Sequence, residues 1–382
     1  MLTILPEISA EELTLVGCVL LTLLLAAVVS FALTPLVKLF SVKVGAIDVP
    51  KDNRRMHDHP IPRLGGLAIF LGFMFAVLLM VPLNGPERGM LLGAVIIVVL
   101  GIFDDIYTLP AKLKFVVQIV AALVAVLSGN RIQVLSNPNI FSENPLWALP
   151  SWLSIAVTVV WIVAITNAVN LIDGLDGLAC GVSTIGSATM LVIALLVSES
   201  DVAMIMGALV GACVGFLPYN FNPAKIFMGD TGATFLGYIM ATMSVQGMFK
   251  MYTFISFVAP FLILGLPIFD VCFAVVRRLS KGQSPMQPDR SHIHHRLIDM
   301  GLSQKQAVGM LYVISAILGL TAVMLTTSGA LKAMIFLVTM ALAALIAWRV
   351  LISGHTGKPG GRSGGEKTET EEEEEEHGPS ER

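Results

Sequence analysis

Long apolar runs separated by short polar loops dominate this chain. A membrane span needs about 20 apolar residues, so the pattern predicts about eleven spans. The predicted spans lie near residues 13–36, 64–83, 89–103, 113–128, 152–169, 178–198, 202–217, 232–249, 253–276, 306–326 and 330–352. The expected fold is therefore an all-α polytopic membrane protein, with one integral membrane domain over residues 1–352.

The composition supports this interpretation and excludes an ordinary soluble protein. Of the 382 residues, 55% are hydrophobic and only 13% are charged, whereas soluble domains carry about 25% charged residues. Residues 353–382 have no apolar face and contain a run of glutamates, so we expect a disordered, acidic cytoplasmic tail. The four cysteines show no metal-type spacing and are expected to be small core residues.

Lysine and arginine are concentrated in loops on one side of the predicted membrane. The basic loops follow the spans near 13–36, 89–103 and 253–276, which are spans of odd number. Because basic loops usually face the cytoplasm, we expect the N-terminus outside the cell and the C-terminus inside.

Five loops on that same side carry most of the polar motifs. They read RRMHDHPIPRLGG, FDDIYTLPAKLK, NAVNLIDGLDGL, PYNFNPAKIFMGDTGAT and RRLSKGQSPMQPDRSHIHHRL. A transporter needs polar groups along a path through the membrane. The one-sided distribution therefore favours a reaction at the cytoplasmic face over transport.

Aspartates in three of these loops predict a cation site. They are Asp104, Asp105, Asp173, Asp176 and Asp230. Converging carboxylates repel one another unless a cation lies among them. Oxygen ligands without histidine or cysteine partners favour Mg²⁺, with Mn²⁺ as an alternative. Each acid taken singly could instead mark a membrane boundary or pair with a nearby lysine.

Other polar residues suit a nucleotide. Histidines 292, 294 and 295 lie between Arg290 and Arg296, and these arginines favour phosphate oxygens over zinc as the partner of the histidines. A pH switch is a third alternative. Asn220 and Phe227 offer hydrogen bonds and stacking for a base, although Phe227 alone could be an interfacial aromatic. The loops together predict a metal-assisted attack by a lipid acceptor on a nucleotide diphosphate.

In this order, the motifs resemble those of the polyprenyl-phosphate N-acetylhexosamine-1-phosphate transferase superfamily (glycosyltransferase family 4). PDRSHIHHRL is similar to the branch that transfers GlcNAc-1-phosphate from UDP-GlcNAc to undecaprenyl phosphate. The resemblance implies release of UMP in the bacterial inner (plasma) membrane, as the first membrane step of teichoic acid, O-antigen or common antigen synthesis. UDP-MurNAc-pentapeptide or another UDP-HexNAc is an alternative donor. An anion or nucleotide-sugar transporter is the alternative from another class.

The resemblance also implies roles for individual residues. Asp104 and Asp105 match an acidic pair at the reaction centre, with one of them as base or metal partner. Asp230 matches a Mg²⁺ ligand, and Asp173 is a second ligand with a catalytic role. The residues implied to contact the uridine are Asp176, Asn220 and Phe227.

Phosphate or sugar contacts are implied for a further set of residues. These are Lys112, Arg290 and His292, together with His294 and His295 as catalytic residues. Candidates for the lipid phosphate are Arg55, His57 and Arg63. The implied partners are UDP-GlcNAc, undecaprenyl phosphate and membrane lipid, with no nucleic acid, and a homodimer is left open.

Overall fold

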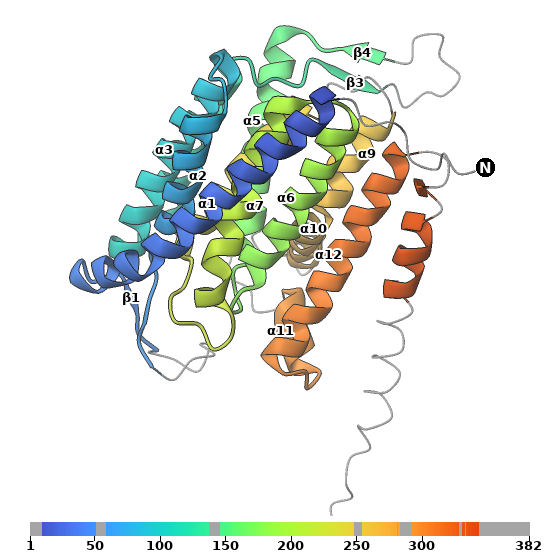
Figure 1. Ribbon diagram of the computed structural model, residues 1–382. Coiled ribbons are helices and arrows are strands. Elements are labelled where there is room, and N and C mark those ends of the chain that lie inside the picture. The colour runs from blue at the N-terminus through green and yellow to red at the C-terminus, as the bar shows by residue number, and fades with distance from the viewer. Residues whose placement is uncertain are drawn as a thin grey trace, which may run out of the picture.

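A bundle of long helices makes up most of the described chain (Figure 1). The computed structural model describes residues 10–50, 59–136, 146–247, 254–280, 282, 292–327, 331–332 and 334–343. The helices are α1 (Ala10–Lys43), α2 (Gly66–Met80), α3 (Gly85–Tyr107), α4 (Ala111–Leu127), α5 (Ser151–Leu171), α6 (Leu178–Leu196), α7 (Ser200–Asn220), α8 (Gly229–Gly247), α9 (Phe254–Ile263), α10 (Gly265–Ser280), α11 (Ile293–Asp299) and α12 (Gln304–Thr326). The predicted tail, 353–382, lies outside the described residues.

The helices confirm an all-α polytopic architecture. Within the described residues, six helices are long and apolar enough to cross a membrane, namely those over Leu13–Lys43, Gly85–Tyr107, Ser151–Leu171, Leu178–Leu196, Ser200–Asn220 and Gln304–Thr326. Helix α2 is apolar but shorter. Apolar runs become helices in lipid because a helix satisfies its own backbone hydrogen bonds.

The predicted span 253–276 is not one uninterrupted helix in its described part. It forms α9 and α10, with a break at Leu264. Pro267 stands four residues after Ile263 and has no N–H to donate to the Ile263 carbonyl, so the helical ladder is interrupted there.

Helix α8 lies in the interior of the bundle. Every residue from Thr231 to Gly247 is buried, and α8 packs against α3 and α5. Two of its threonine hydroxyls donate to carbonyls one turn earlier in the helix, Thr234 to Asp230 at 2.6 Å and Thr242 to Tyr238 at 2.9 Å. By contrast, α1 exposes large apolar side chains such as Leu20 and Leu24. Helix α8 is therefore enclosed by protein, and its first turn is held at the end of the bundle.

Two short antiparallel strand pairs were not predicted. Strands β1 (Ile47–Asp48) and β2 (Ile61–Pro62) pair at one end of the bundle, and β3 (Val134–Ser136) and β4 (Leu146–Ala148) pair at the other (Figure 1). Strands of this length are too short to show the alternation of apolar and polar residues by which a strand is recognised in a sequence. The first pair fixes the next residue, Arg63, whose N–H donates to the Ala46 carbonyl at 3.0 Å.

Candidate active site

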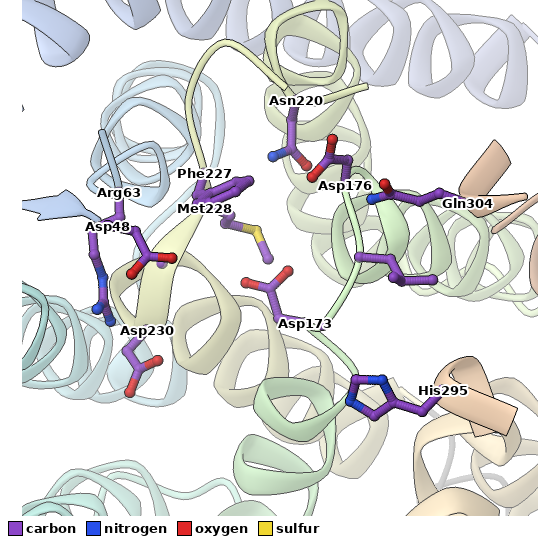
Figure 2. A pocket seen from close by; sticks show the side chains of 13 residues that line it. Asp48, Arg63, Asp173, Asp176, Asn220, Phe227, Met228, Asp230, His295 and Gln304 are labelled. Carbon is purple, nitrogen blue, oxygen red and sulfur yellow. The ribbon is translucent and has the colours of Figure 1, made fainter. Parts of the chain in front are cut away.

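The polar motifs meet around one cavity of about 390 Å³. Figure 2 shows Asp173, Asp230 and His295 around this space, although they come from a loop, from α8 and from α11. The lining residues are Asp48, Arg63, Asp173, Gly174, Leu175, Asp176, Asn220, Phe227, Met228, Gly229, Asp230, His295 and Gln304. The cavity therefore joins motifs that are far apart in the sequence.

Asp105 holds the amino end of α8. Its carboxylate accepts hydrogen bonds from the backbone N–H groups of Asp230 and Thr231, each at 3.0 Å, and from the Thr231 hydroxyl at 2.6 Å. The Arg63 guanidinium donates to the same carboxylate at 2.9 and 3.0 Å. The amino end of a helix has unpaired N–H groups and a partial positive charge, and a carboxylate satisfies both. Every oxygen of Asp105 is thus engaged by protein donors.

Gly229 makes this close approach possible. Its φ is +72°, a left-handed conformation that glycine adopts without strain. A Cβ at this position would overlap the Arg63 carbonyl and the Asp105 carboxylate. The glycine of the MGD motif is therefore required by packing around Asp105.

Asp104, the neighbouring acid, belongs to a different contact group. The Lys114 ammonium lies 2.8 Å from an Asp104 oxygen and 3.2 Å from an Asp230 oxygen. The other Asp104 oxygen accepts from the Leu109 N–H at 2.7 Å. Lys114 thus bridges two carboxylates from α3 and α8, and a cation between them offsets their repulsion.

Asp173 is placed where a negative charge is costly. Burial, followed by the charges of Asp230 and Asp105, raises the pKa of Asp173 to about 8. Arg63 opposes this shift but does not cancel it. A carboxylate with a raised pKa beside a second carboxylate is an electrostatic arrangement that a bound cation would relieve.

Asp176, the second acid of the DGLD motif, has a structural partner in the next loop. It accepts from the Asn222 side chain at 2.9 Å and from the Ala224 N–H at 3.0 Å. Asn222 also donates to the Gln304 side chain at 2.8 Å. Asn220 donates to the Ile226 carbonyl at 3.0 Å. These bonds hold the loop after α7 so that Asn220 and Phe227 face the cavity.

The histidine motif packs directly on the DGLD loop. The His294 ring lies against Gly174, where any Cβ would overlap its Nε2. The His295 ring is 4.3 Å from the His294 ring and lines the cavity. Burial, then the neighbouring His295, lowers the pKa of His294 to about 4. His294 is therefore neutral at pH 7 and offers a hydrogen bond rather than a charge.

The cavity includes many of the residues singled out in the sequence, but not all. Asp173, Asp176, Asn220, Phe227, Asp230 and His295 line it, as does Arg63. Lys112 is exposed and outside the lining, and Lys114 one half-turn later is the lysine among the acids. Arg55, His57 and Arg290 lie outside the described residues.

Sequence reasoning missed Lys114, Asp48 and Gln304. The motif FDDIYTLPAKLK contains two lysines, and helical geometry was the only signal that could separate them. Lys114 is ten residues after Asp104 in the chain, yet it returns to that acid because α3 ends at Tyr107 and α4 begins at Ala111.

Two of the acids face the cavity in a way that suits a Mg²⁺ ion. No cluster of three or more histidine, cysteine or acidic side chains at metal-binding separation occurs within the described part of the chain. Mg²⁺ usually binds through one or two carboxylates, with waters and substrate phosphates as its other ligands. Asp173 and Asp230, facing one cavity, fit that pattern.

Comparisons with known proteins agree with the geometry. Residues 88–248 match the family described as glycosyl transferase family 4. The chain is 44% identical over 297 residues to a probable undecaprenyl-phosphate N-acetylglucosaminyl 1-phosphate transferase of Bacillus subtilis, covering 78% of this chain and 82% of the relative. It is 35% identical over 333 residues to a decaprenyl-phosphate N-acetylglucosaminephosphotransferase of Mycolicibacterium smegmatis, covering 80% of each.

A third relative is more distant. The undecaprenyl-phosphate alpha-N-acetylglucosaminyl 1-phosphate transferase of Escherichia coli O157:H7 is 29% identical over 320 residues, which are 81% of this chain and 86% of the relative. The resemblance seen in the loop motifs is therefore confirmed over most of the chain. On this similarity, the protein belongs to glycosyl transferase family 4.

Proposed function

We propose that the protein transfers N-acetylglucosamine 1-phosphate from UDP-GlcNAc to undecaprenyl phosphate, releasing UMP and forming undecaprenyl-diphospho-GlcNAc. The observation that carries the proposal is the single cavity in which Asp173, Asp230 and His295 meet beside Arg63. The names of the relatives support the chemistry and the lipid acceptor. Acids, cations and an aromatic face in one cavity match the diphosphate, the sugar and the base of such a donor.

The reaction is a phosphoryl transfer at the β-phosphorus. An oxygen of the lipid phosphate forms the new P–O bond, the bond to the bridging oxygen breaks, and UMP leaves with the α-phosphate. A phosphate monoester is largely dianionic near pH 7 because its second pKa is about 6. A strong base is then unnecessary, and positioning with charge neutralisation supplies most of the catalysis.

Each group in or beside the cavity has a proposed task. Arg63 and Lys114 supply positive charge near the phosphates, and His295 donates to a phosphate or sugar oxygen. Phe227 and Asn220 face the nucleoside, as suits stacking and amide contacts. Asp105 contributes indirectly by holding the first turn of α8.

Asp230 and Asp173 are proposed to hold Mg²⁺, with Mn²⁺ as the alternative. When bound, the ion would neutralise charge on the diphosphate oxygens during transfer. The proximity of the two carboxylates to one cavity, and the raised pKa of Asp173, support this assignment.

UMP release is the direct test. Membranes containing the protein are given UDP-GlcNAc with and without undecaprenyl phosphate, and UMP is measured. We expect release only when the lipid phosphate is present. Equal release without the lipid would contradict transfer to it. Substituting UDP-MurNAc-pentapeptide as donor tests the sugar, because a faster reaction with that donor would overturn the GlcNAc assignment.

We also propose about eleven spans, an outer N-terminus and a cytoplasmic active site in the bacterial plasma membrane, at the start of a cell-envelope polysaccharide. The basic loops and the position of the polar motifs at one end of the bundle support this orientation. Single cysteines placed at Lys112 and at Trp147 would test it with a membrane-impermeant thiol reagent on intact cells. Only the cysteine at Trp147 should react.

A further inference from the structure

Asp270 is a buried acid on α10 that the proposed chemistry does not use. It is only 3% exposed, and it lies within the predicted span 253–276. Ionisable residues at membrane depth are rare and usually have a partner and a function. Its partners therefore show what it does.

Both carboxylate oxygens of Asp270 contact the start of the histidine motif. One oxygen lies 2.8 Å from Nδ1 of His292, which is 6% exposed, and the other accepts the Ile293 N–H at 2.8 Å. His292 is the N-cap residue of α11 and has no side-chain capping bond of its own. Asp270 thus supplies the missing cap from another helix and fixes the His292 ring at the same time.

The His292 ring is connected to the cavity by contacts through two neighbouring histidine rings. The rings of His292 and His294 are stacked with an angle of 4° and centroids 5.9 Å apart. His294 in turn packs against Gly174 and lies beside His295. A continuous contact path therefore runs from Asp270 to the loop that carries Asp173 and to the His295 side of the cavity.

We propose that Asp270 is a positioning residue for the transfer reaction, which locks the ring orientation of His292 and thereby places His294 against the DGLD loop and His295 at the cavity. The Nδ1 atom of His292 must carry a proton, because it faces a carboxylate that can only accept. This arrangement parallels a metal-bound or catalytic histidine whose other nitrogen is oriented by an acid. The effect of Asp270 on the rate of transfer rests on the proposed function. The protonation of His292 at Nδ1 does not depend on that function.

Asp270 lies close to the start of α10. Helix α10 begins at Gly265, so Asp270 lies in its second turn.

Nitrogen NMR on the protein labelled at histidine in lipid discs tests the tautomer directly. The signal of His292 is assigned by its loss in His292→Gln. We expect a protonated Nδ1 in the parent, and in Asp270→Asn we expect a shift toward protonated Nε2, because the amide can donate to Nδ1. An unprotonated Nδ1 in the parent would overturn the proposal, whatever the activity.

The rate of UMP release tests whether Asp270 acts as a positioning residue. Asp270→Asn should lower kcat for UMP release at least about tenfold, the factor expected from losing one charge-assisted hydrogen bond. The KM for UDP-GlcNAc should change less than kcat, since the cavity lining itself is intact. Asp270→Asn combined with His292→Gln should be no slower than His292→Gln alone.

Asp299→Asn is the matched control, because Asp299 is an exposed acid at the other end of α11, the helix whose first turn Asp270 caps. It should transfer like the parent. Parent-like kinetics for a well-inserted Asp270→Asn would overturn the positioning role. A parent inactive with UDP-GlcNAc would count against the proposed donor, and the NMR result would still decide the role of Asp270.

Discussion

Replacing Asp105 with asparagine tests whether this acid acts mainly by holding α8 or as a base. The Asp105 side chain is fully buried and accepts from Arg63, from Asp230 and from Thr231. Asparagine keeps one oxygen, but its NH₂ group replaces the other and faces protein donors. The variant therefore leaves at least one buried donor without an acceptor.

The magnitude follows from these contacts. A buried donor without a partner costs about 1–3 kcal/mol. Loss of the charge opposite Arg63 adds about 0–1 kcal/mol, because 27% of the Arg63 side chain is exposed and solvent weakens the pair. We expect the free energy of unfolding to fall by about 1–4 kcal/mol in total. The Mg²⁺ concentration for half-maximal transfer should also rise, since Asp230 loses its support.

The assay combines detergent unfolding with UMP release for the parent, Asp105→Asn, Arg63→Met and the double variant. Because Arg63 and Asp105 contact each other, their effects should be non-additive by about 0.5–3 kcal/mol. Asp299→Asn serves as the exposed control. Unchanged stability and Mg²⁺ dependence, with a loss confined to kcat, would refute the holding role and favour a base.

Three further substitutions test other parts of the site. Asp230→Asn should abolish nearly all transfer while the protein remains inserted and folded, and normal turnover at ordinary Mg²⁺ would exclude Asp230 as a ligand. Lys114→Met should lower kcat/KM more than Lys112→Met, because only Lys114 bridges two acids; the reverse order in UMP release would exclude this assignment. Gly174→Ala should destabilise the protein by about 1–3 kcal/mol, because the new methyl group overlaps the His294 ring. Adding His294→Ala should recover stability in thermal unfolding, and no recovery would show that this overlap is absent.

The helices could be predicted from the sequence because each one forms for reasons contained in its own run of residues. A run of apolar residues in lipid has to satisfy its backbone within itself, and the helix does so. The break at Leu264 was missed although its signal, Pro267, was visible, because prolines are tolerated in many membrane helices. The residue types of the site were also visible, since acids at the ends of apolar runs are costly.

The tasks of those residues were decided by the tertiary structure. Asp104 and Asp105 are adjacent in the chain, yet one contacts Lys114 and the other is enclosed by Arg63 and the start of α8. These partners come from 10 to 126 residues away in sequence. A carboxylate has the same intrinsic chemistry at every position, and only the donors, charges and burial around it determine whether it holds a helix, binds a cation or orients a histidine.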